Sequence, residues 1–398
     1  MEDQRLNILI FSAGMVSGAF RRMMDIIDSM DGAKYRFFVA YKPGYADWGD
    51  DEIDMIAGSG ATVVPLRGRR LFDPRGFIDL WRIITREEIA ILHSWDVLGV
   101  PARIVAALAG ITIVEELGNP PPARFSEISF KHYLINKATS ILVDGFVACS
   151  HGVMKRYREE RALFLRNTVT SVVHNSIDLS RIFLPRTPAP LLRQRYGLSA
   201  GAVVVTTIGY FNEQKAQDDL LRAFKRVTTE RPDSLLCLVG WGRLDGHLKG
   251  LTRALGLEGR VIFTGRLSQD QVFEVLSVSD LFVLSSHWEG FGIVLAEAMA
   301  LGKPVVSTET DGSREVVSPG ETGILVPVKN PELLAEAIVT MLRQPDVMAR
   351  MGAAGLRRVS RCFSREGFVA GYEAFYSALG VKRHGRGAAR GRGRHDGT

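Results

Sequence analysis

The sequence predicts two doubly wound α/β domains that face a central cleft. Apolar runs of strand length alternate with helical patterns along both halves of the chain. The length of 398 residues is more than one compact core accommodates. In each half, a strand is followed by a glycine-containing turn and then by a helix, which is the unit from which parallel sheets with helices on both faces are built.

Composition places the chain among ordinary globular proteins, with 46% hydrophobic and 24% charged residues. No apolar run reaches the roughly 18 residues of a membrane-spanning helix. The first residues are polar and lead directly into a strand pattern, unlike a secretory signal. Cys149, Cys237 and Cys362 have neither metal-site nor disulfide spacing and suit a reducing compartment. We therefore expect a cytoplasmic protein, either free or peripheral on the inner face of the membrane.

The first half begins with a strand at residues 7–11, a small-residue turn that contains Gly14, and a helix over residues 20–30. This turn lacks the G-x-G-x-x-G spacing, so a dinucleotide fingerprint is not supported. Further strands are predicted at residues 35–41, 61–65, 89–94, 111–114 and 145–150, with helices over residues 100–108 and 130–140.

Residues 67–86 combine helical spacing with many basic side chains. The apolar residues Phe77, Leu80, Trp81 and Ile84 fall at helical spacing. Such a segment is either a helix that covers a sheet or a helix that lies on a membrane surface.

The second half repeats the strand–turn–helix pattern. A strand over residues 203–209 leads into a turn that contains Lys215 and then into a helix ending near Phe224. Strands are also predicted at residues 235–239, 261–264, 280–284 and 305–308, and helices over residues 331–342 and 363–379.

The chemistry of this half centres on the stretch Ser285–Gly302, which follows the strand at residues 280–284. Gly290 and Gly292 allow the turn to approach a ligand closely. The next residues are good helix formers, and the first amides of a helix have no partner within it. Together with the helix dipole, these amides form an anion site suited to a diphosphate.

Two carboxylates lie on either side of that anion site. Glu289 stands at its entrance, and Glu297 lies about five residues inside the helix, roughly 7–8 Å away at about 1.5 Å per residue. This is the separation between a diphosphate and the ribose of the same nucleotide, and a carboxylate can accept hydrogen bonds from ribose hydroxyls. An isolated pair of glutamates could equally be ordinary helix charges, so the surrounding residues decide between the two interpretations.

Those residues resemble a known family. From Glu289 the chain reads Glu-Gly-Phe-Gly, four further residues, Glu-Ala-Met-Ala, and then Leu-Gly-Lys-Pro-Val-Val. This is similar to the E-x7-E signature of the retaining GT4 glycosyltransferases, which have the GT-B fold. Val261–Gly265 and Gly320–Pro327 extend the resemblance on both sides. It implies that the second half binds a nucleoside-diphosphate sugar, either a UDP- or a GDP-sugar, and that the first half binds the acceptor.

The resemblance also implies roles for individual residues. Glu289 and Lys215 are the candidate catalytic residues: the carboxylate contacts the sugar near the reacting carbon, and the lysine stabilises the departing phosphates. Glu297 is expected to bind the ribose. The remaining candidate donor-binding residues are Gly290, Phe291, Gly292, Ile293, Arg266, Tyr210 and Gly14.

Two positions depart from the family pattern. Tyr210 stands where an arginine is common, and the segment that contains Glu116 lacks the histidine that many members have there. Glu116 either points into the cleft, where it would make the pocket more negative, or caps its strand. These departures leave an alternative function, in which a catalytically impaired GT-B protein binds a sugar nucleotide as a partner or regulatory subunit.

The predicted organisation is an acceptor domain over residues 1–185, a linker over 186–200, a donor domain over 201–361, a helix over 362–380 that crosses back to the first domain, and a disordered basic tail over 381–398. We expect a glycan, lipid-linked or small-molecule acceptor, in the synthesis of cell-surface polysaccharide or lipopolysaccharide. Neither a metal nor another cofactor is predicted. A weak contact with an anionic membrane surface is expected, and nucleic acid is not.

Overall fold

The structure is a computed structural model. It describes residues 5–11, 17–43, 50–68, 72–95, 99–120, 130–161, 168–182 and 187–380. The predictions for Gly14 and for the basic tail lie outside these residues.

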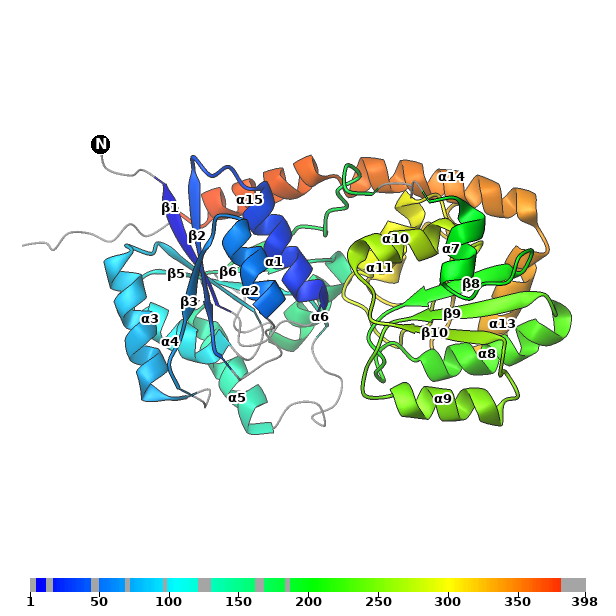
Figure 1. Cartoon of the computed structure of the whole chain (residues 1–398). Helices are drawn as coiled ribbons and strands as arrows, with labels where there is room; N and C mark the ends of the chain where they lie inside the picture. Colours follow the sequence, from blue (N-terminus) through cyan, green and yellow to red (C-terminus); the bar gives the residue numbers. More distant parts are fainter. Residues whose placement is uncertain are drawn as a thin grey trace, which may run out of the picture.

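Each half of the described chain forms one parallel β-sheet, as the alternating pattern predicts (Figure 1). The first sheet has the order β3-β2-β1-β4-β5-β6-β7 and the second the order β10-β9-β8-β11-β12-β13. The strands of the first sheet are β1 (Leu6–Phe11), β2 (Tyr35–Tyr41), β3 (Thr62–Pro65), β4 (Ile91–Trp95), β5 (Thr112–Leu117), β6 (Gly145–Ala148) and β7 (Val169–Val172). Those of the second are β8 (Val203–Ile208), β9 (Ser234–Val239), β10 (Val261–Gly265), β11 (Leu281–Leu284), β12 (Val305–Thr308) and β13 (Gly323–Val326).

Helices cover both faces of each sheet, because a parallel sheet is apolar on both sides. The first half has α1 (Ser17–Ser29), α2 (Asp50–Gly58), α3 (Pro74–Arg86), α4 (Val100–Ala109), α5 (Phe130–Thr139), a 3-10 turn (Ser140–Leu142) and α6 (His151–Arg161). The second half has α7 (Ala189–Arg195), α8 (Gln217–Glu230), α9 (Asp245–Ala254), α10 (Gln269–Ser277), α11 (Ile293–Ala300), α12 (Ser313–Val316), α13 (Pro331–Leu342), α14 (Pro345–Cys362) and α15 (Arg365–Ala378). None of the described helices is long and apolar enough to cross a bilayer.

Helix α3 covers the first sheet and also presents apolar residues to solvent. Leu80 and Ile84 are buried in the core, and Phe77 packs against it. Ile78 and Trp81 lie on the outer face and are 47% and 44% exposed. The sheet-covering interpretation is therefore correct, and the outer face of α3 carries two exposed apolar side chains.

The last helix returns to the first sheet (Figure 1). α14 packs against α11 in the second half, and α15 then contacts β7 and α1. A methyl group added at Gly145 in β6 would lie 2.5 Å from the side chain of Leu379, so α15 approaches the sheet closely. Tyr372 and Tyr376 of α15 are buried there. The last helix of the described chain therefore packs against the first domain.

The order of the second sheet places two turns side by side. From β8 the chain adds β9 and β10 on one side of the sheet, and then β11, β12 and β13 on the other side. β8 and β11 are therefore neighbours in the sheet, although the start of β11 at Leu281 lies 73 positions after the end of β8 at Ile208. In open parallel sheets, ligands bind outside the carboxyl ends of the strands at such a reversal. Lys215 follows β8 and Glu289 follows β11, so this topology brings the two candidate catalytic residues together.

Candidate active site

Lys215 and Glu289 form an ion pair at the reversal point of the second sheet. The Lys215 Nζ contacts Glu289 Oε1, and the Ser286 hydroxyl donates to the same oxygen at 2.6 Å. The lysine turn is held by Asn212, whose side-chain oxygen accepts from the Lys215 N–H at 3.1 Å. Glu289 is only 5% exposed, so the attraction between the two charges is stronger than it would be in water.

The first turn of α11 has backbone donors available beside this ion pair. Gly292 precedes the helix with φ of 88°, a left-handed conformation that favours glycine, and no side chain caps the helix. Within the described part of the chain, the amides of Gly290, Phe291 and Gly292 have no hydrogen-bond acceptor. Ile293 is the first helical residue, so its amide has no intrahelical partner either. These amides are the backbone donors on which the predicted anion site depends.

Gly290 also forms part of the contact between the two domains. A methyl group at this position would overlap the carbonyl oxygen of Gly118, at the end of β5 in the first domain. Because backbone atoms cannot move aside as a side chain can, the turn or the domain contact would have to shift.

We expect Gly290→Ala to lower the transfer rate at least about tenfold, since a displaced turn misplaces the amides that are expected to bind the donor phosphates. Steady-state kinetics of the purified variant measure this loss. Gly246→Ala in α9 is the matched control, because a methyl group there meets no atom within 4 Å. Equal rates for the two variants would contradict the assignment of this turn to the donor site.

Glu297 lies in α11 and is paired with the other domain. Its carboxylate accepts from Gln269 Nε2 at 2.8 Å and forms an ion pair with the guanidinium of Arg21 in α1. Glu297 is buried, whereas the Arg21 side chain is partly exposed. Arg21 and Gln269 are not among the residues predicted from the sequence, because neither belongs to the glutamate motif in the chain.

Tyr210 and Arg266 meet at a third residue, Trp241. The Arg266 guanidinium lies over the Trp241 ring, 4.9 Å from its centroid, and Tyr210 approaches the same ring edge-on at 5.8 Å. Arg266 also pairs at 3.1 Å with Glu52 of α2 in the first domain. The structure therefore brings both predicted residues together around an aromatic side chain that the sequence analysis did not select.

Neither expected position for Glu116 is correct. Its carboxylate is fully buried. It accepts hydrogen bonds from Arg22 Nε at 2.6 Å and from the Tyr372 hydroxyl at 2.7 Å, and it also contacts His93 Nε2 at 3.1 Å. Burial raises the pKa of Glu116, but Arg22 and the hydrogen bonds outweigh it, and the net pKa lies below its ordinary value. This charge is therefore neutralised inside the first domain, and it does not make the cleft more negative.

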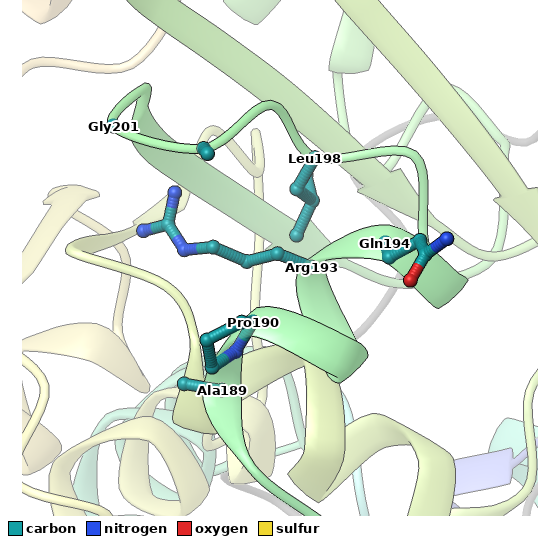
Figure 2. A pocket seen from close by; sticks show the side chains of 7 residues that line it. Ala189, Pro190, Arg193, Gln194, Leu198 and Gly201 are labelled. Atoms are coloured by element: carbon teal, nitrogen blue, oxygen red, sulfur yellow. The ribbon is translucent and has the colours of Figure 1, made fainter.

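A hollow of about 470 Å³ lies elsewhere, between α7 and the start of β8 (Figure 2). Arg193 lines it, but its guanidinium donates to the carbonyl oxygens of Ala202 at 2.8 Å and Ser199 at 3.2 Å. Since these bonds hold the arginine in place, the hollow lacks a charged group directed at a ligand. The turns after β8 and β11, with the Lys215–Glu289 pair, therefore form the candidate active site.

Comparison with known proteins identifies the family. The family model of glycosyl transferases group 1 matches residues 189–358. N-acetyl-alpha-D-glucosaminyl L-malate synthase of Bacillus anthracis is 34% identical over 307 residues, which cover 74% of this chain and 76% of that protein. The chain belongs to the group 1 glycosyltransferases. A second relative, the GDP-mannose-dependent monoacylated alpha-(1-6)-phosphatidylinositol monomannoside mannosyltransferase of Corynebacterium glutamicum, is 32% identical over 201 residues, and this glycosyltransferase matches 52% of its length.

Solved structures show the same fold as this glycosyltransferase. Anabaena HepE in complex with UDP-glucose has a TM-score of 0.79 at 21% identity, over 94% of this chain and 100% of that chain. The lipopolysaccharide glycosyltransferase WaaG has a TM-score of 0.71 at 14% identity, over 94% and 99% of the two chains. At these identities the likeness concerns the fold alone, and it confirms the predicted GT-B architecture.

Proposed function

We propose that this glycosyltransferase moves a sugar, with retention of configuration, from a nucleoside-diphosphate sugar to an acceptor held by the first domain. The observation that carries the proposal is the Lys215–Glu289 pair beside the unpartnered amides of the turn that leads into α11. A partly buried lysine and helix-tip amides suit a diphosphate, and a carboxylate suits the sugar attached to it. Retention follows from the resemblance of the glutamate motif to the retaining GT4 signature.

The main requirement of the reaction is to stabilise the charge that develops on the departing diphosphate. In this proposal, Lys215 exchanges its contact with Glu289 for a phosphate oxygen. The carboxylate of Glu289 is then free to accept a hydrogen bond from the sugar near the reacting carbon. Glu297 makes a similar exchange, in which ribose hydroxyls replace Arg21.

We propose that the donor is a UDP- or GDP-sugar. Anabaena HepE is a structural neighbour in complex with UDP-glucose, and the C. glutamicum relative is named for GDP-mannose. Around the base, Trp241 and Arg266 offer flat surfaces on which a ring can stack.

The proposed acceptor is a glycan, a lipid-linked sugar or a small molecule. The relatives cover this range: one is named a malate synthase, and a Rhizobium meliloti relative, LpsE, is named for lipopolysaccharide core biosynthesis. A role in cell-surface polysaccharide or lipopolysaccharide synthesis is part of the same proposal.

Thermal shift with UDP, GDP and ADP tests the donor site directly, because a ligand that binds only the folded state raises its melting temperature. We expect UDP or GDP to raise the melting temperature. Lys215→Ala should lower the affinity for that nucleotide at least about tenfold, the effect of losing one charge-assisted contact. Lys225→Ala, an exposed lysine on α8, is the matched control. Equal nucleotide affinity in the two variants would reject the site. Binding without transfer to any acceptor would favour the impaired partner protein instead.

We also propose that the outer face of α3 contacts an anionic membrane surface. Exposed Ile78 and Trp81 are accompanied by the exposed arginines Arg82 and Arg86. Apolar and aromatic side chains enter the interface, and basic side chains attract acidic headgroups.

Vesicle flotation tests this contact. We expect the protein to float with phosphatidylglycerol vesicles more than with phosphatidylcholine vesicles, and Trp81→Ser to reduce the bound fraction several-fold, since the aromatic contact is lost. Leu191→Ser, which changes an exposed residue of α7 in the second half, should bind as the unmodified protein does. A Trp81→Ser variant that floats equally well would rule out this face.

A further inference from the structure

We propose that His151, His174 and Glu315 form a site for a divalent transition-metal ion such as Zn²⁺, which links the two domains. One ligand atom from each residue lies within 4.8 Å of the others. His151 begins α6 and His174 follows β7, both in the first domain, whereas Glu315 lies in α12 of the second. The site exists only where the two domains meet.

The donor set matches the preferences of these ions. Imidazole nitrogen suits zinc, nickel and copper, and two histidines with one glutamate form a known three-ligand set for zinc. Three protein ligands leave the fourth position of a tetrahedral ion to water. The histidines and the glutamate are exposed or partly exposed, so an ion in solution can reach them.

The spacing requires only a small adjustment. Zinc bonds of about 2.0–2.1 Å place the ligand atoms of a tetrahedral site about 3.3 Å apart. His174 Nε2 and Glu315 Oε2 now share a hydrogen bond of 2.7 Å, and the rings of His151 and His174 are 5.6 Å apart, nearly edge to face. The ion would take the place of the Nε2 proton, which is released to solvent. The exposed His151 side chain is free to turn toward it.

Contacts around the site already hold two of the three ligands in position. The second carboxylate oxygen of Glu315 accepts from the Gly152 N–H at 2.8 Å. The His174 ring lies against Phe291 at 5.8 Å and against Phe363 at 5.6 Å. Such outer contacts orient metal ligands and strengthen binding.

An ion at this position would connect the domain contact with the donor site. It would hold α12 of the second domain to α6 and the end of β7 in the first. Phe291, which contacts the His174 ring, belongs to the turn that precedes α11. No metal was predicted from the sequence. His174 and Glu315 are 141 positions apart, and no local motif connects them.

Equilibrium binding of Zn²⁺ and Co²⁺ to the full chain tests the site. Every protein in the experiment carries Cys362→Ser, because that exposed thiol is itself a metal ligand. We expect one ion to bind by calorimetry, with the absorption of four-coordinate Co²⁺, and Zn²⁺ to raise the melting temperature.

His151→Ala should weaken binding more than about 100-fold and abolish the thermal shift, since loss of outer contacts alone costs about 10–100-fold. This variant removes an exposed side chain and leaves the His174–Glu315 hydrogen bond in place, so it should fold. The control is His247→Ala, which removes an exposed histidine from α9. Equal metal affinity and stoichiometry in the two variants, or no binding by the parent protein, would overturn the proposal.

Discussion

Glu289→Ala is expected to lower kcat by roughly 100- to 1,000-fold, the usual effect of removing a preorganised group that stabilises charge in the transition state. KM for the donor should stay unchanged or fall. The reason is that Lys215, which now pairs with Glu289, would be left without its carboxylate and would remain available to the diphosphate. A loss confined to kcat identifies an interaction made in the transition state rather than in donor binding.

Initial-rate kinetics, with a donor identified by thermal shift, measure kcat and KM separately. Glu289→Gln keeps the shape of the glutamate side chain and should recover only part of kcat, because the amide lacks the charge. Glu309→Ala serves as the control, since that carboxylate pairs with Arg314 at the surface, at 3.1 Å. If Glu289→Ala raises KM and leaves kcat intact, the residue only binds the donor and its catalytic assignment is wrong.

Glu116→Ala is expected to destabilise the protein by about 3–5 kcal/mol, the usual cost of breaking a buried ion pair by removing one partner. Arg22 would keep a fully buried charge, and its remaining acceptors among the described residues would be the Asn175 side chain, at 2.5 Å, and the Val173 carbonyl, at 2.8 Å. His93 and Tyr372 would each lose a hydrogen bond as well.

Denaturant unfolding followed by circular dichroism measures this change. Glu373→Ala, on α15, is the control: its ion pair with Lys34 is partly exposed, so it should cost less than about 1 kcal/mol. The loss of stability in Glu116→Gln should lie between those of Glu116→Ala and Glu373→Ala, because the glutamine retains an acceptor for Arg22. Similar stabilities for Glu116→Ala and Glu373→Ala would show that Glu116 does not hold the first sheet to α15.

The main features of the second domain could be predicted from the sequence because they are local. β11, the glycine turn and α11 follow one another within residues 281–300, and β8 with its lysine turn lies within residues 203–216. Apolar periodicity and turn residues report such short units well. The motif also placed Glu297 within the helix and Glu289 in the turn before it, and the structure has both residues there.

The partners of those residues could not be predicted in the same way. Arg21 is 276 positions from Glu297, and Tyr372 is 256 positions from Glu116. Periodicity assigns a side chain to a face of its own element, but it carries no information on which distant charge will meet it. The expectation that Glu116 faces the cleft or caps its strand was wrong for this reason.

By itself, the sequence determined the alternation of strands and helices, the glycine-containing turn before α11 and the family to which the chain belongs. Only the tertiary structure decided which charges neutralise one another and which residues of the two domains meet, as His174 and Glu315 do. The physical reason is that helix hydrogen bonds and the apolar periodicity of a strand depend on residues nearby in the chain, whereas an ion pair across a domain contact depends on how two surfaces built from distant segments fit together.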